Sequence, residues 1–217
     1  MSSPTHTLFG YGSLIDRESR RRTVPESIEA IPVIASGVAR GWWKPGSPVG
    51  YSTTFVAARL AADATCTGVL YSVDTDGLAQ TDQREIGYRR VLLDPTAITR
   101  LDGETAPLPS PIWFYALDES SHRPNAQYPI VQSYVDLCVG GSLELEGAFP
   151  AAKAYGFAQA FIETTQDWNA YWVNDRIHPR RPFVHVPRAM TIDALLHEAV
   201  PALFNRIQIE PAHWDTG

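Results

Sequence analysis

The chain has 217 residues, 44% hydrophobic and 19% charged, which suffices for one well-packed domain with or without an extension. Its formal net charge of -6 disfavours general binding to nucleic acid or acidic membranes, because such binding needs summed positive potential. The cysteines Cys66 and Cys138 cannot form a disulfide framework and lack zinc-binding spacing. With no leader-like start and no apolar run of about 18 residues, we expect a soluble cytoplasmic protein without a membrane span.

Residues 8–15, with the sequence LFGYGSLI, predict a strand, a tight turn and a helix start. Gly10 and Gly12 flank Tyr11, and glycine lets a ligand approach the main chain closely. Such a turn directs several backbone N–H groups at one spot, where they can hold an anion or a carbonyl oxygen. The motif fits neither the dinucleotide fingerprint nor the phosphate loop, and a purely structural turn is the alternative.

The first two thirds of the chain alternate strands with short helices. Residues 33–43 predict a bent or bulged strand, joined through a turn at 44–50 to a hairpin partner at 51–60. Further strands are expected at 67–73, 88–93 and 112–117, and helices at 16–23 and 76–86. This succession predicts a small, largely antiparallel or mixed barrel with helices at its mouth.

Beyond Tyr128 the pattern becomes helical. We expect a helix from Pro129 that ends at Gly140-Gly141, with Ile130 and Tyr134 on one face. A second helix is expected over 150–165, with Ala154, Phe157, Ala158 and Phe161 facing the core, and a third is expected to be capped by Thr191. Residues 167–187 have two interpretations. They form a ligand surface or, as we favour, they pack aromatic rings under a loop with the arginines extending outward. The residues concerned are Trp168, Tyr171, Trp172, Arg176, His178, Arg180 and Arg181.

Glu85 is the carboxylate that could complement the glycine turn. It follows Leu78 by seven residues, so both share one helix face and Glu85 should lie near the edge of the core. Asp82 falls on the same side, and either partial burial or a second carboxylate would raise the pKa of Glu85 toward the range useful for proton transfer. The alternative is a solvated helix end with Glu85 paired to a neighbouring arginine: Arg84, Arg89 or Arg90.

Two segments together resemble the γ-glutamylcyclotransferase-like superfamily. Residues 9–14 resemble its Tyr-Gly-Ser turn, and strand 68–71 followed by residues 82–88 is similar to its strand and its Asp-x-x-Glu helix end, which carries the catalytic glutamate. The resemblance implies an α+β fold, a small mixed β-barrel with flanking helices, to which this chain adds a C-terminal helical extension. We expect a single domain over 1–217, with a core at 7–147 and an extension at 148–217 packed on it.

The resemblance also implies an activity without metal or organic cofactor. Family members cyclise a γ-glutamyl group to 5-oxoproline and release an amino acid or amine, as in glutathione metabolism. Glu85 would be the catalytic acid and base, and Tyr11, Gly12, Ser13, Leu14 and Tyr88 would bind substrate. Other tyrosines are candidates for the pocket that cannot be aligned individually: Tyr115, Tyr128 and Tyr134.

The expected partner is a small γ-glutamyl compound, with neither nucleic acid nor membrane, and a homodimer is left open. The alternative function is a non-catalytic module of the same fold that serves binding or assembly. We disfavour Ser13 as a covalent nucleophile because the sequence has no nucleophile elbow. We also disfavour a zinc hydrolase, since His197-Glu198 lacks the second histidine of a helical zinc site.

Overall fold

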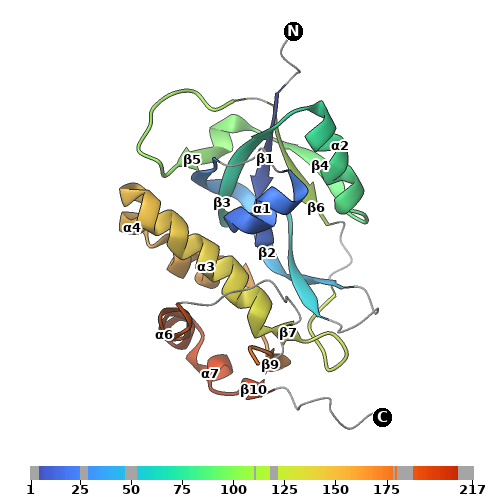
Figure 1. Ribbon diagram of the computed structural model, residues 1–217, viewed down its shortest axis with the longest axis vertical. Coiled ribbons are helices and arrows are strands. Elements are labelled where there is room, and N and C mark those ends of the chain that lie inside the picture. The colour runs from blue at the N-terminus through green and yellow to red at the C-terminus, as the bar shows by residue number, and fades with distance from the viewer. Residues whose placement is uncertain are drawn as a thin grey trace.

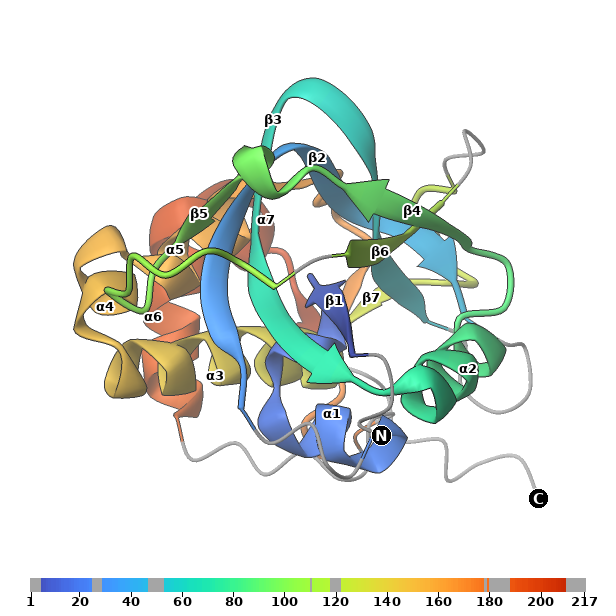
Figure 2. The same ribbon diagram turned by 90° about the horizontal axis from the view of Figure 1, so that it is seen from above.

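The computed structural model describes residues 5–24, 29–46, 53–109, 111–117, 122–177, 179 and 188–209. Within these ranges, seven strands form one curled, mixed sheet that makes a half-barrel, in the order β4-β6-β1-β3-β2-β5 with β8 beside β2 (Figures 1 and 2). The strands are β1 (His6–Gly10), β2 (Ile31–Pro45), β3 (Thr54–Val73), β4 (Arg89–Leu93), β5 (Ile98–Arg100), β6 (Ile112–Ala116) and β8 (Thr165–Gln166). β1 and β6 run parallel, whereas β1 and β3 run antiparallel, so the sheet is mixed as the sequence predicts.

The long hairpin of β2 and β3 gives the half-barrel its curvature. β2 carries the predicted irregularities, with register shifts between Ser36 and Val38 and between Trp42 and Lys44. The prediction of separate strands at 51–60 and 67–73 is wrong, because β3 is continuous over 54–73 and residues 61–64 arch out opposite Gly37 (Figure 2). Residues 47–52 of the predicted turn and strand lie outside the described part.

Short capped helices follow the strands at the mouth of the half-barrel, as expected. A 3-10 helix η1 (Ser13–Ile15) leads into α1 (Arg17–Thr23), where the Asp16 carboxylate accepts the Ser19 N–H at 2.6 Å. α2 (Thr75–Arg84) is capped in the same way by Asp74, which accepts from the N–H of Gly77 at 2.7 Å. A second 3-10 helix, η2 (Pro95–Ala97), joins β4 to β5.

The helix predicted from Pro129 starts later and ends later. Ile130–Val131 form a short strand, β7, and α3 then runs over Gln132–Ala148, straight through Gly140-Gly141. A side chain on Gly141 would come within 2.8 Å of the backbone of Asp16. This glycine therefore serves close packing of α3 against the η1–α1 junction, and it does not end the helix.

The C-terminal helices break where the sequence suggested continuity. The predicted helix over 150–165 is two helices, α4 (Pro150–Tyr155) and α5 (Phe157–Thr164), because Gly156 adopts a left-handed conformation with φ of 72°. Ala152 is buried in place of Ala154, which is exposed. α6 (Ala189–Ala199) begins after Arg188, so Thr191 lies inside the helix and does not cap it, and α7 (Pro201–Phe204) follows.

A second, small parallel sheet lies near the C-terminal end of the chain (Figure 1). Among the described residues it comprises β7, β9 (Trp172–Asn174) and β10 (Gln208–Ile209), in the order β10-β9-β7. Trp172 is buried there and donates its indole N–H to Gln132 at 3.1 Å. The ring of Trp168 lies tilted against Trp172 at 4.8 Å between centroids and meets Trp42 edge to face at 4.9 Å. Aromatic packing is thus the role of these tryptophans, as we favoured.

Arg176 does not extend outward as expected. Its guanidinium bonds the buried Asp136 on α3 at 2.7 Å and Asp193 on α6 at 2.7 and 2.8 Å, joining the two helices. These two carboxylates, distant in sequence, satisfy the fork of Arg176, which is why the side chain turns inward. His178, Arg180 and Arg181 lie outside the described residues.

Helices α3, α5 and α6 share one hydrophobic core with β1 and β3, and a second cluster fills the inside of the half-barrel. Arg40 of β2, itself fully buried, donates six hydrogen bonds of 2.7–3.4 Å. The acceptors are all neutral oxygens: the backbone carbonyls of Tyr11, Thr67 and Phe161 and the hydroxyls of Thr67, Thr164 and Thr165. No helix within the described ranges has the length and apolar character needed to cross a bilayer.

Candidate active site

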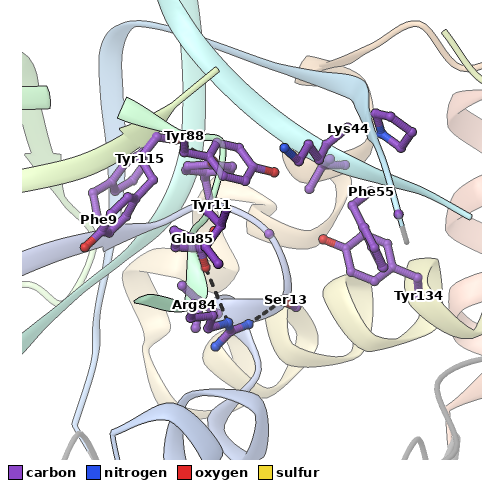
Figure 3. A pocket seen from close by; sticks show the side chains of 16 residues that line it. Phe9, Tyr11, Ser13, Lys44, Phe55, Arg84, Glu85, Tyr88, Tyr115 and Tyr134 are labelled. Carbon is purple, nitrogen blue, oxygen red and sulfur yellow. Dashed lines mark hydrogen bonds and ion pairs between the residues drawn. The ribbon is translucent and has the colours of Figure 1, made fainter. Parts of the chain in front are cut away.

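A cavity of about 430 Å³ opens where the β1–η1 turn, the end of α2 and the β2–β3 hairpin meet (Figure 3). This size is within the usual range for small-molecule sites. All six site residues predicted from the sequence line it: Tyr11, Gly12, Ser13, Leu14, Glu85 and Tyr88. The remaining lining residues include Phe9, Lys44, Phe55, Arg84, Ile86, Tyr115 and Tyr134. The structure thus brings together two motifs separated by about 70 residues of sequence.

The glycine turn enters the cavity through the 3-10 helix η1. Ile15 donates its N–H to the Gly12 carbonyl at 2.9 Å, so the backbone N–H groups at the start of η1 have no acceptor within that helix. A side chain on Gly12 would come within 2.8 Å of Val56 and 3.0 Å of the Tyr134 hydroxyl. Only glycine allows the turn to lie this close to the cavity wall. A ligand oxygen can therefore approach the N–H groups of the turn.

Tyr11 is held at both its side chain and its backbone. Its hydroxyl donates to the carbonyl of Tyr115 at 2.6 Å, and its own carbonyl accepts from Arg40 at 3.1 Å. Burial, followed by the nearby Tyr88 and Glu85, raises the pKa of the Tyr11 phenol well above its usual value. Tyr11 is therefore a neutral hydrogen-bond donor that fixes the turn, and it is not a base.

Glu85 is the residue at which α2 ends, and its position follows from the helix register. Leu78 of α2 is buried, as predicted. Glu85 lies on the same side of the helix, and 16% of its side chain is exposed. Burial raises the pKa of the Glu85 carboxyl, against the charges of Arg84 and Lys44, which lower it. A carboxyl in this environment can exchange protons at a pH nearer neutrality than an exposed one.

Arg84 connects the two halves of the site. Its Nε lies 3.3 Å from a carboxylate oxygen of Glu85, and an η nitrogen lies 3.4 Å from the Ser13 hydroxyl, as the dashed lines of Figure 3 show. The guanidinium also donates to Thr23 at the end of α1. The arginine pairing that we considered as an alternative thus coexists with partial burial of the carboxylate.

Asp82 takes a supporting position instead of lining the cavity. It accepts the Tyr115 hydroxyl at 2.7 Å and pairs with Arg90 at 2.6 Å. Tyr115 is thereby fixed by α2 through its hydroxyl and by Tyr11 through its carbonyl. Among the four tyrosines considered for the pocket, Tyr88, Tyr115 and Tyr134 line it, whereas Tyr128 is not a lining residue and accepts a bond from Thr54 through its backbone carbonyl at 2.7 Å.

Lys44 and Phe55 are pocket residues that the sequence analysis missed. Both come from the β2–β3 hairpin and lie with Tyr134 on one side of the cavity, opposite Tyr11 and Tyr115 (Figure 3). The Lys44 ammonium lies 4.8 Å from the centre of the Tyr88 ring, a cation–π distance. The one sequence signal was that Lys44 directly follows the buried pair Trp42-Trp43 at the end of a bulged strand.

No protein-family model and no curated protein matches the sequence. Among solved structures, a γ-glutamyl cyclotransferase superposes with a TM-score of 0.52 at 13% identity, over 70% of this chain and 87% of that one. A yeast γ-glutamyl cyclotransferase specific to glutathione gives a TM-score of 0.41 at 14% identity, over 74% and 97% of the chains. An uncharacterized human protein gives 0.49 at 12% identity, over 70% and 86%.

The first of these comparisons identifies the fold, which is γ-glutamylcyclotransferase-like: a curled mixed sheet with flanking helices, in the α+β class. The fold class predicted from the sequence is thereby confirmed. At such low identity the likeness extends to the fold alone, so activity has to be argued from the site.

Proposed function

We propose that the chain is a cytoplasmic γ-glutamyl cyclotransferase that converts a γ-glutamyl amide to 5-oxoproline and releases an amino acid or amine. One observation carries the proposal: a largely buried carboxylate with a raised pKa, Glu85, shares one cavity with the backbone of the Gly12–Leu14 turn. A proton acceptor and an oxygen-binding turn are the two groups that this intramolecular acyl transfer requires.

The reaction joins two groups of one substrate. The α-amine attacks the γ-carbonyl carbon, a new C–N bond closes the ring, and the original amide C–N bond breaks. Glu85 takes a proton from the α-ammonium and returns it to the leaving nitrogen, and the second proton that the ring nitrogen loses on cyclisation passes to the released amine. The enzyme needs no covalent intermediate. The N–H groups of the turn hold the substrate's α-carboxylate or its developing oxyanion. Tyr11 and Tyr88 help to hold the cyclising conformer, which lowers the entropic part of the barrier.

The Arg84–Glu85 ion pair favours the second candidate, a non-catalytic module of the same fold, because Arg84 already occupies the carboxylate. Incubation with a panel of γ-glutamyl amino acids, γ-glutamylamines and glutathione, followed by an assay for 5-oxoproline, separates the two. The cyclotransferase proposal predicts release from at least one compound. If no compound yields 5-oxoproline, the proposal is abandoned in favour of the module.

Glu85→Gln should lower kcat on the order of 10²-fold or more, because it removes a positioned general base. Glu18→Gln is the matched control, since it makes the same change on exposed helix α1, where Glu18 pairs with Arg21. Steady-state kinetics with circular dichroism as a folding check would measure both. Unchanged turnover in Glu85→Gln would exclude Glu85 from the mechanism.

The pH profile provides a second test of the same residue. The ionised form of Glu85 is the active base, so kcat/KM should fall as pH drops through the raised pKa. The midpoint of that acid limb should therefore lie above the ordinary glutamate value of 4.5. A rate profile over acidic to neutral pH measures it, and a midpoint at or below the ordinary value would contradict the assignment.

A further inference from the structure

The charges that line the cavity are unequal. Arg84 and Glu85 form an ion pair and largely compensate each other. Lys44 forms no ion pair with any carboxylate of the described residues, and its ammonium rests over the Tyr88 ring. The cavity therefore carries one uncompensated positive charge on an aromatic wall, which favours a ligand with an anionic group at that place.

The turn after α2 makes room for this ammonium. Gly87 has a left-handed φ of 85°, and a side chain there would come within 2.7 Å of the Lys44 Nζ. The backbone of this turn thus passes close beside the Lys44 ammonium, which extends from the β2–β3 hairpin toward the turn. The site for an anion is built from two separate elements of the fold.

Lys44 lies toward the outer end of the cavity. Tyr11 and Tyr115 at the inner end are 9% and 6% exposed. The Lys44 ammonium lies beside Gly87, and the preceding residue Ile86, which also lines the cavity, is 80% exposed. The amine or amino acid must be released to solvent after the ring closes, which places the γ-glutamyl group at the inner end of the cavity. The leaving group then extends outward, past Lys44.

We propose that Lys44 forms a leaving-group subsite that binds a carboxylate, so that the substrates are γ-glutamyl amino acids or peptides in preference to γ-glutamylamines. This inference rests on the proposed function. An amino acid leaving group carries a carboxylate that a simple amine lacks. The ammonium of Lys44 donates to that carboxylate, and the rings of Phe55 and Tyr134 contact the side chain that accompanies it.

The test compares γ-glutamyl-alanine with γ-glutamyl-ethylamine, which differ only by the carboxylate on the leaving group. The wild-type protein should prefer γ-glutamyl-alanine in kcat/KM, and Lys44→Gln should reduce that preference about tenfold, mainly through KM. The ratio is the measured quantity because loss of the Lys44 charge also changes the pKa of Glu85, an effect common to both compounds. Lys44→Arg should restore most of the preference.

The control is Lys153→Gln. The chain contains two lysines, and Lys153 is exposed on α4, so this variant has the same net charge as Lys44→Gln without touching the cavity. It should keep the wild-type preference. Raising the salt concentration should weaken the preference of the wild-type protein more than that of Lys44→Gln, because screening acts on the charge that the variant lacks.

Calorimetric binding of both compounds to Glu85→Gln, with and without Lys44→Gln, gives a readout that does not depend on turnover. Tighter binding of γ-glutamyl-alanine that Lys44→Gln abolishes supports the subsite. The subsite is overturned if the wild-type protein has equal kcat/KM for the two compounds, or if Lys44→Gln weakens the binding of both compounds equally. If neither compound nor the wider panel yields 5-oxoproline, the proposed function fails. The binding comparison then still decides whether Lys44 binds the carboxylate of γ-glutamyl-alanine.

Discussion

Arg40 and Arg176 both join the C-terminal helices to the rest of the molecule, but with opposite kinds of partner. Arg40 is wholly buried and bonds only neutral oxygens, including the carbonyl of Tyr11 at the site. Arg176 is partly exposed and bonds two carboxylates, Asp136 and Asp193, away from the site. Of the two, only Arg40 contacts the glycine turn of the cavity. Its bonds therefore affect both the stability of the fold and the geometry of the site, whereas those of Arg176 affect stability alone.

The largest effect is expected from Arg40→Met. It removes the guanidinium from the buried carbonyls of Tyr11, Thr67 and Phe161, of which Phe161 keeps the Thr165 hydroxyl as a donor. Hydrogen bonds to a charged group contribute about 1.5–3 kcal/mol each, so the free energy of unfolding should fall by about 4 kcal/mol or more. Urea denaturation measures the change. A loss below about 1 kcal/mol would mean that other groups or water satisfy these oxygens and that Arg40 is not a structural centre.

Arg176→Met should lower the free energy of unfolding by about 3 kcal/mol, because it leaves the buried charge of Asp136 unpaired. Arg176→Met combined with Asp136→Asn should recover at least about 1 kcal/mol of that loss, since the orphaned charge is removed too. Additive losses in the same denaturation assay would contradict this. No comparable rescue exists for Arg40, because three of its acceptors are backbone carbonyls.

Arg40→Lys sharpens the comparison at the level of activity. Lysine keeps the charge but lacks the planar fork, so the bond to the Tyr11 carbonyl and the bonds to α5 cannot all persist. The turn should shift, and kcat/KM should fall on the order of tenfold in protein that is still folded. Arg176→Lys is the control and should leave kcat/KM near the wild-type value, and an equal loss in both variants would remove the distinction.

The smallest effect is expected from Asp193→Asn. Asp193 is 36% exposed at its side chain, so its pairing with Arg176 is partly screened by solvent, and the loss should stay below about 1 kcal/mol. The difference from the wild-type protein should shrink further at about 1 M salt. Denaturation at low and high salt tests this, and a salt-independent loss would show that the bond acts through geometry instead of charge.

The candidate site was predicted from two short segments together with the family that they resemble. The residues of the Gly12 turn and Glu85 each belong to a short segment whose element is set by its own glycines, caps and apolar spacing, and the fold brings these segments to one cavity. Lys44 was not predictable in the same way. Its place depends on a bulge in β2 and on the backbone of Gly87, contacts between segments that no local pattern encodes.

The errors in the fold have the same origin. Gly141 looked like a helix end because its local preference is to stop a helix, yet its packing against Asp16 decides the outcome. Ile130 looked helical by spacing, but its N–H bonds the carbonyl of Tyr171, some 40 residues away, and Ile130 becomes a strand. Arg176 looked like a surface residue because its two carboxylates are distant in sequence.

The bonds from Arg40 to α5 limit how this fold can be recombined. A chimera that takes residues 7–147 and replaces the rest would inherit the guanidinium without the oxygens of Phe161, Thr164 and Thr165 that receive its Nε and Nη2 donors. In such a chimera the guanidinium would be buried next to the glycine turn with its Nε donor unsatisfied. Any viable exchange must therefore move Arg40 and the end of α5 together, as one inherited unit.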